Sequence, residues 1–326
     1  MFVSDLAFVY GDPHFVTLDG LQYTFNGKGE FTLIETDDSA FTLQGRMMEV
    51  TTNPGRPASA TVLSALVARQ LDSDTVQFSI SRRGVDVFVN GELVEVSVGN
   101  QVPVWNAVIS RPNELGYGVH FSCGVNIETR KQLEYLSAVA VSLPVSFMNH
   151  TTGLLGYFNG NQRDDLLPKR DVNPLPLNSD LLAIHEGFGL TCELNDINQS
   201  IPQSNPFTHF TTYYVNYYIT AKSCAVIGLL FTYSGIIDSP EGSLFTYRRS
   251  ESFFDFFNPW FSADFDPFFA SPELEAEAIK LCSGDEFCLF DVIATGQLEV
   301  GNLTRITSQR RAELIELSKP SKNKSI

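Results

Sequence analysis

The sequence is poor in cysteine, in basic clusters and in long apolar runs. Five cysteines among 326 residues are too few, and an odd number, for a disulfide scaffold. The net charge is −16, and no Lys/Arg cluster beyond Arg310-Arg311 is present, which argues against nucleic acid as a partner. No apolar run reaches the length of a membrane span, and residues 1–10 do not look like a signal peptide.

The remaining composition is that of a globular protein. Hydrophobic residues make up 43% of the chain, and its length allows one large or two ordinary domains. Cys282 and Cys288 are close enough for a local disulfide, and Cys123 could pair with Cys192, which leaves Cys224 over. Four Asn-x-Ser/Thr sequons are compatible with secretion. They begin at Asn149, Asn198, Asn302 and Asn323.

Short strand-like runs separated by turns occupy the first part of the chain. Apolar and polar residues alternate over 85–89 and 94–98, as in half-buried antiparallel strands. Runs of this spacing predict a mainly β fold, an antiparallel β-sandwich. The expected strands are 15–18, 21–25, 31–34, 41–44, 75–80, 85–89, 93–98, 119–122 and 139–143.

The C-terminal part predicts a small helical region. Ser271-Pro272-Glu273 supplies a hydroxyl cap, a proline at the first helical position and an acid in the first turn. We expect helices over 272–282, 286–295 and 304–317. The aromatic run from Phe253 to Phe261 is expected to cover the β domain and to hold the helical region onto it; an exposed run would instead mark an interface.

The residues from Gly11 to Phe31, GDPHFVTLDGLQYTFNGKGEF, predict a β-hairpin reversing at Asp19-Gly20. The pattern Gly-Asp-Pro-His, Thr-x-Asp-Gly and Tyr-x-Phe-x-Gly resembles the opening of a von Willebrand factor type D domain. Further details are similar to a cysteine-poor branch of that family, which includes Mesh, sushi-domain-containing and mucin 4-type proteins. They are the Asn-Gly-Lys-Gly-Glu-Phe turn, Gly-Leu-Leu-Gly before an acidic loop, Ser-Leu-Phe-Thr-Tyr and the small helical region around Cys282 and Cys288.

The resemblance implies three parts. Residues 1–191 would form the type D domain, and 238–326 an aromatic segment followed by a small helical, C8-like region. Residues 192–237 are an atypical insert, because Lys222 is the only formally charged residue between Asp196 and Asp238. We hypothesise that much of it is a retained intron; a lineage-specific loop is the equal alternative. Sequencing the transcript separates the two.

A calcium site is implied by the acidic loop Asn159-Gly-Asn-Gln-Arg-Asp-Asp165. Carboxylate and amide oxygens on a glycine-containing loop are the hard ligands that Ca²⁺ takes. Carried over from the family, the ligands would be Asp19, Asn159, Asn161 through its carbonyl, Asp164 and Asp165. Many relatives have Cys-Gly-Asn-Phe where residues 155–158 read Leu-Gly-Tyr-Phe, so one asparagine ligand is absent. The alternative is a solvated acidic turn, and a paired-carboxylate hydrolase is a minor option.

The Asp12-Pro13 bond is a second candidate site. In some relatives the aspartyl carboxyl of this motif attacks its own carbonyl, so that the chain cleaves itself under mildly acidic conditions. By resemblance Asp12 would be the internal nucleophile and His14 a proton donor. The alternative is structural, a proline that fixes how the chain enters the first strand.

The resemblance implies a non-enzymatic, extracellular fragment of a membrane-anchored protein of cell adhesion or epithelial junctions. Its partners would be other extracellular or junction proteins, and it would meet the membrane only through parts outside this chain. A secreted mucin would need more cysteines for disulfide-linked assembly, and a vitellogenin-like carrier would need a lipid-binding region. The full-length transcript distinguishes the three.

Overall fold

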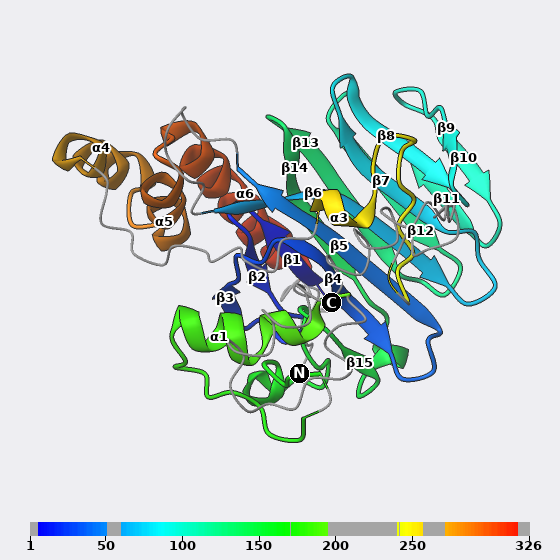
Figure 1. The fold of residues 1–326 in the computed structure, drawn as a ribbon, viewed down its shortest axis with the longest axis horizontal. Coiled ribbons are helices and arrows are strands. Elements are labelled where there is room, and N and C mark those ends of the chain that lie inside the picture. The colour runs from blue at the N-terminus through cyan, green and yellow to red at the C-terminus, as the bar shows by residue number, and fades with distance from the viewer. Residues whose placement is uncertain are drawn as a thin grey trace, which may run out of the picture.

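The chain folds into two antiparallel sheets with a helical region at one end (Figure 1). The computed structural model describes residues 6–50, 60–169, 171–194, 240, 242–256 and 271–318. The predicted fold class, mainly β with a small helical region after it, is confirmed. The insert lies almost wholly outside the described residues, so the retained-intron hypothesis and the division into three parts remain predictions.

The first sheet has eight strands in the order β10-β11-β12-β13-β14-β1-β2-β3. Strand β1 pairs antiparallel with β14 on one side and with β2 on the other. The strands are β1 (Leu6–Tyr10), β2 (His14–Val16), β3 (Gln22–Thr24), β10 (Gln101–Val104), β11 (Ala107–Ser110), β12 (Gly116–Phe121), β13 (Asn126–Gln132) and β14 (Tyr135–Ser142).

The second sheet has seven strands in the order β15-β4-β5-β6-β7-β8-β9. Its strands are β4 (Gly29–Thr36), β5 (Phe41–Glu49), β6 (Thr61–Gln70), β7 (Val76–Ser81), β8 (Gly84–Val89), β9 (Glu92–Val94) and β15 (Thr151–Thr152). The expected strand over 93–98 is shorter than predicted. It leaves the ladder after Val94, and the carbonyl of Val96 then accepts a hydrogen bond from Arg111.

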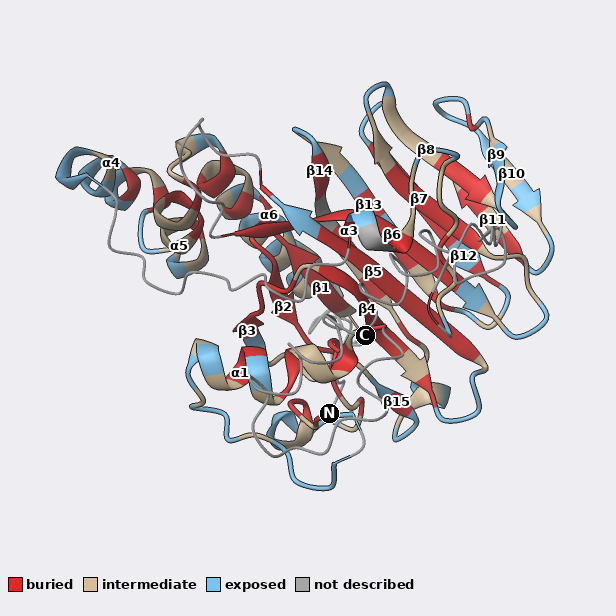
Figure 2. Cartoon of the chain, viewed as in Figure 1, coloured by how far each residue is buried: buried red, intermediate tan, exposed pale blue. Residues whose placement is uncertain are grey.

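One continuous apolar core lies between the sheets, with the aromatic rings of Phe15, Phe31, Phe41, Phe78 and Phe121 at its centre. Strands β5 and β6 are buried over most of their length (Figure 2). They are covered on the inner face by the core, and Ala65 and Val67 of β6 contact Phe245 on the outer face. A strand buried on both faces shows no alternation, which is why β6 was not among the predicted strands.

The predicted hairpin is present, with a wider reversal than a two-residue primed turn. Strands β2 and β3 pair with His14 opposite Thr24. The amide of Gly20 donates to the carbonyl of Thr17, and that of Thr17 to the carbonyl of Leu21. Only Gly20, at φ 88°, has a positive φ within this loop. The reversal is therefore a turn followed by one left-handed glycine, with Asp19 at its tip.

The helices and their caps follow the sequence closely. The side chain of Ser271 caps α4, and that of Asp285 caps α5. Helix α6 begins at Leu298, earlier than predicted. Gly301 in its first part lets α5 come close, since a Cβ there would lie 2.3 Å from Val292 Cγ2. The helices are α1 (Leu181–Gly187), α3 (Phe253–Phe256), α4 (Pro272–Cys282), α5 (Glu286–Thr295) and α6 (Leu298–Ser318), with short 3₁₀ turns η1 (Val145–Phe147), η2 (Gln162–Asp164) and η3 (Gly189–Cys192).

The helical region docks on the outer side of the first sheet (Figure 1). Phe287 of α5 stacks on His14 with ring centroids 4.1 Å apart and meets Tyr10 edge-on. Of the expected aromatic run, Phe253 and Phe256 are buried, and 257–270 lie outside the described residues. Among the helices that the structure describes, none has both the length and the apolar composition needed to cross a bilayer.

Candidate functional site

The tip of the first hairpin meets the acidic loop. Asp19 Oδ2 accepts hydrogen bonds from the amides of Asn159, at 3.1 Å, and Asn161, at 2.8 Å. The side chain of Gln162 donates to the carbonyl of Asp19 at 2.9 Å. Two segments 140 residues apart in sequence therefore form one oxygen-rich site.

Two carboxylate oxygens at this site have no hydrogen-bond partner. Asp164 Oδ2 accepts from the side-chain amide of Asn159 at 2.8 Å. Within the described part of the chain, however, Asp19 Oδ1 and Asp164 Oδ1 are both buried and unpaired. Buried polar atoms without partners are costly and uncommon. Two such oxygens beside amide and carbonyl oxygens fit a hard cation.

Asp165 is arranged differently from the other predicted ligands. Its Oδ2 accepts from the hydroxyl of Thr17 at 2.7 Å, and its Oδ1 from the amide of Tyr157 at 3.2 Å. Burial, together with repulsion from Asp19 and Asp164, raises the pKa of Asp165 to about 7. In this conformation both of its oxygens have protein partners, so its role as a ligand remains a prediction.

The donor set is mixed rather than rich in charge. In the described ranges no group of three or more His, Cys, Asp or Glu side chains is placed to hold a metal ion. Asn159 Oδ1 lies at the same site, where it accepts from the amide of Asn161 at 2.8 Å. A cation here would be held by Asp19 and Asp164 with amide or carbonyl oxygens of Asn159 and Asn161, which is a set that suits Ca²⁺ and not zinc.

The Asp12 side chain is fully buried at the second candidate site. Neither of its carboxylate oxygens has a hydrogen-bond partner within the residues that the structure describes. Burial, with repulsion from Asp291, raises the pKa of Asp12 well above its ordinary value; Asn26 and the amide of Thr61 offset this only in part. This environment favours the neutral carboxylic acid more than an exposed aspartate would.

His14 is fixed on both sides of its ring. Nδ1 lies 2.8 Å from Thr24 Oγ1, and Nε2 lies 2.7 Å from Asp291 Oδ1. Asp291, on α5, and His14 are both completely buried. Since both ring nitrogens are engaged, this geometry does not support the predicted role of His14 as proton donor to Pro13.

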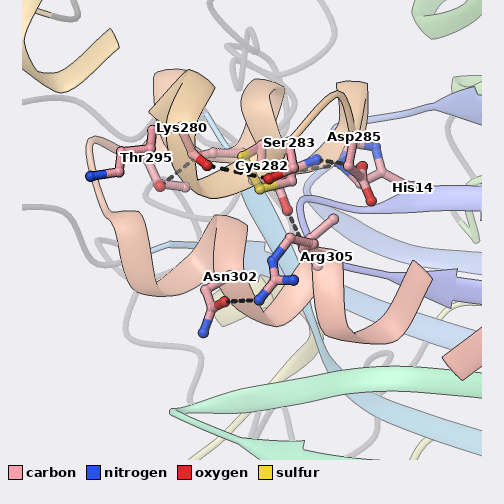
Figure 3. The surroundings of a disulfide bond; sticks show 11 residues. His14, Lys280, Cys282, Ser283, Asp285, Thr295, Asn302 and Arg305 are labelled. Carbon is pink, nitrogen blue, oxygen red and sulfur yellow. Dashed lines mark hydrogen bonds and ion pairs between the residues drawn. A yellow bond between two sulfur atoms is a disulfide. The ribbon is translucent and has the colours of Figure 1, made fainter. Parts of the chain in front are cut away.

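One disulfide is present where the sequence predicted it. Cys282, the last residue of α4, is bonded to Cys288 of α5 (Figure 3). The bridge joins two helix ends that their caps already bring together. The disulfide therefore belongs to the helical region and does not cross to the β domain.

The second predicted disulfide, between Cys123 and Cys192, is wrong: both cysteines are free. Glu193, next to Cys192, forms a bridge to Phe31. Cys123 donates its amide to Gln70. Strand pairing aligns Phe31 of β4 with a position on β6 that is four residues from Gln70. Four residues along a strand span about 13 Å, at roughly 3.3 Å per residue. A disulfide needs a Cα separation under about 7 Å.

The sequons are only partly within the described chain. Asn149 is exposed in a tight turn at φ 65°, and Asn302 is half-buried on α6. Asn198 and Asn323, like Cys224, lie outside the described residues. Glycosylation at the four sequons remains a prediction.

Three residues of these sites were missed by sequence analysis. Thr17 holds Asp165, and Asp291 holds His14. Thr304 of α6 donates its hydroxyl to Asp291 Oδ2. Thr17 is the threonine of the Thr-x-Asp-Gly pattern, but nothing local indicated its bond to Asp165. Asp291 and Thr304 carry no local signal, because each meets its partner only when distant elements pack together.

Comparison with known families agrees with this anatomy. The von Willebrand factor type D domain matches residues 7–171, and the Mucin-4-like C8-3 domain matches residues 268–316. The type D match covers the residues of both candidate sites except Asp291 and Thr304, which lie within the C8-3 match.

Individual relatives show the same organisation over more of the chain. Human "Sushi domain-containing protein 2" is 29% identical over 97% of this chain and 34% of its own length. "Protein mesh" of Bombyx mori is 34% identical over 60% of this chain and 13% of its own, and rat "Mucin-4" is 29% identical over 91% and 11%. The chain thus spans about a third or less of these relatives. It belongs to the von Willebrand factor type D domain family, in the group of sushi domain-containing, mesh and mucin-4 proteins.

Proposed function

We propose that this chain is a non-enzymatic, extracellular part of a membrane-anchored adhesion or epithelial-junction protein. In this proposal it holds a structural calcium ion and cleaves itself once, between Asp12 and Pro13. Kinship with mucin, mesh and sushi-domain proteins supports an adhesion or mucin-like role. The low cysteine number and the acidic charge favour contacts with other extracellular proteins over disulfide-linked polymers or nucleic acid.

The observation that carries the calcium proposal is the pair of buried, unpaired carboxylate oxygens on Asp19 and Asp164. These belong to segments that are far apart in sequence and joined by the bonds from Asp19 to Asn159 and Asn161. Calcium would neutralise the two acids and join the hairpin tip to the loop. Extracellular calcium modules bind with dissociation constants of about 10⁻⁴ to 10⁻³ M.

Calorimetric titration and thermal melting test the site. At about a hundred times the dissociation constant, bound calcium adds about 2.7 kcal/mol of stability, which raises the melting temperature by roughly 4 °C in a chain of this size. Asp164→Asn should remove both the heat and the shift. Glu186→Gln, a loss of the same charge from the exposed face of α1, should keep both. Absence of heat and of any shift in the native chain with calcium at tens of millimolar, about a hundred times the expected dissociation constant, contradicts the site.

The self-cleavage proposal rests on the buried Asp12 carboxyl. In its neutral form, one oxygen of the carboxyl group forms a bond to the Asp12 carbonyl carbon. The carbon–nitrogen bond to Pro13 breaks, and the carboxyl proton ends on the proline nitrogen. Water then opens the resulting cyclic anhydride to two carboxyl groups. Because the reaction starts from the neutral acid, its rate should fall as pH rises through the raised pKa of Asp12.

A second Asp-Pro bond, Asp266-Pro267, provides an internal control. Incubation near pH 5 should yield a new N-terminus at Pro13 and none at Pro267. Asp12→Ala should abolish the product, and a chain unfolded in denaturant should lose the preference. Equal cleavage of the two bonds would show ordinary acid lability and contradict the proposal.

The cellular setting is tested on the full-length transcript. We expect it to encode a single membrane span beyond this chain. A cysteine-dense array would instead support a secreted mucin, and a large lipid-binding region a vitellogenin-like carrier.

A further inference from the structure

The Gly-Asp-Pro-His turn is covered by the helical region rather than exposed. Phe287 stacks on the imidazole of His14, and Phe290 meets it edge-on with centroids 5.7 Å apart. Figure 3 shows His14 reaching from the sheet to the helices around the disulfide. The turn that contains the scissile bond is thus enclosed between the β domain and α5.

Asp291 contacts this turn on both sides of the bond. After the bond, its Oδ1 lies 2.7 Å from His14 Nε2. Before the bond, its Oδ2 faces Gly11 so closely that a Cβ on that residue would lie 2.5 Å away. The hydroxyl of Thr304, on α6, fixes the same carboxylate.

We propose that Asp291 is the positioning residue for self-cleavage at Asp12-Pro13, so that the helical region controls a bond in the type D domain. This inference rests on the proposed self-cleavage. By lying against Gly11 and bonding to His14, Asp291 limits the conformations of the two residues between them. A carboxyl group that must reach its own carbonyl carbon gains rate from such restriction.

The charge of Asp291 acts in the same direction. Groups near Asp12 are Asp291 from α5, His14 from β2, Tyr135 from β14, and Asn26 with the amide of Thr61. Of these, Asp291 repels the ionised form of Asp12 and so favours the neutral acid from which cleavage starts. Loss of that charge should lower the pKa of Asp12.

The test compares three variants in the full chain by the rate of appearance of the Pro13 N-terminus across pH 4–8. Asp291→Asn should cleave at least tenfold more slowly near pH 5, and its pH profile should move to lower pH. Thr304→Val keeps the charge of Asp291 and removes one restraint, so a smaller loss is expected without a shift of the profile. Val292→Ala weakens the core of the helical region without touching His14 and should leave rate and profile near the native values.

Thr304→Val also removes the Asn302 sequon, and Asn302→Gln alone controls for this change. If Asp291→Asn does not fold, the cleavage rate of Thr304→Val decides instead. Cleavage of Thr304→Val at the native rate overturns the inference. If Asp291→Asn folds and cleaves with the native rate and pH profile, the inference about Asp291 is overturned. The proposed self-cleavage then still stands, because the native chain cleaves. Equal slowing in Val292→Ala would show a merely structural role and overturns the inference too. No cleavage of the native chain overturns both.

Discussion

Three residues of the Gly-Asp-Pro-His motif each have a separate physical task in this fold. Asp12 is a carboxyl group enclosed without hydrogen bonds, and His14 is anchored through both ring nitrogens. Gly11 adopts φ 64° where Asp291 and Thr304 leave no room for a Cβ. Gly11, Asp12 and His14 therefore all interact with a helical region that begins about 260 positions later in the sequence.

We expect Gly11→Ala to be strongly destabilising. The new Cβ would lie 2.5 Å from Asp291 Oδ2 and 2.6 Å from Thr304 Oγ1, and a left-handed alanine costs roughly 1–2 kcal/mol by itself. Gly99→Ala is the matched control, because Gly99 has φ 80° and nothing within 4 Å of an added Cβ. Denaturant unfolding should show a larger loss for Gly11→Ala by about 1 kcal/mol or more; equal losses would show that the contact is unimportant.

His185 should weaken the protein in acid. Burial against Phe25 lowers the pKa of His185 to about 4, whereas in the unfolded chain it is about 6.5. Below pH 6.5 the unfolded state binds a proton that the native state does not, so stability falls as pH drops toward 4, by up to about 3 kcal/mol. In His185→Gln this component should be absent, while the exposed His120→Gln should retain it. Parallel pH–stability curves for native and His185→Gln chains would contradict the assignment.

At the scale of elements, a short segment after the insert is fastened to the second sheet. Arg46, buried on β5, pairs with the buried Glu30 at 2.8 Å. Its guanidinium lies 4.4, 4.9 and 3.9 Å from the ring centroids of Phe245, Tyr247 and Phe256. The hydroxyl of Tyr247 donates to Glu30 at 2.9 Å. The residues of Ser-Leu-Phe-Thr-Tyr thus cover the outer face of β5 and β6.

Arg46→Met should cost about 3–5 kcal/mol, because it leaves Glu30 buried without its cation. Burial already raises the pKa of Glu30 despite Arg46, so the variant should be least stable at high pH, where Glu30 must ionise. Adding Glu30→Gln should restore part of the loss. Lys28→Met, which breaks the more exposed pair with Glu49, should cost under about 1 kcal/mol. A small effect of Arg46→Met, within the range of Lys28→Met, would contradict the role of the Arg46–Glu30 pair in holding this segment on the sheet.

Elements with local signals were predictable from the sequence, whereas those that depend on distant partners were not. The caps at Ser271 and Asp285 act on residues three positions away and were found correctly. Strand β6 does not alternate between apolar and polar residues, because segment 243–256 covers its outer face. The link between His14 and Asp291 spans 277 positions and has no sequence pattern of its own. The predicted Cys123–Cys192 disulfide was wrong for the same reason. The positions of two cysteines in the sequence do not show how far apart they lie in the folded sheets.

At the scale of the whole molecule, the position of the scissile bond predicts that cleavage will not separate the pieces. Strand β1 pairs from Leu6 to Tyr10 with β14 and over its second half with β2. Its residues Ala7, Phe8, Val9 and Tyr10 are at most 3% exposed. Burial of each large apolar side chain contributes about 1.5–3 kcal/mol, and cleavage after Asp12 leaves all of these contacts in place.

Cleaved protein should therefore elute from gel filtration as one species, and mass spectrometry of that peak should find residues 1–12 together with the remainder. Denaturant should release the short piece. Phe8→Ala removes a ring that lies between Leu6, Val16 and the helical region, so it should allow partial release after cleavage. Leu93→Ala, at an exposed position on edge strand β9, should not. Loss of the short piece from the native cleaved protein without denaturant would show that the peptide bond, and not the sheet, holds β1.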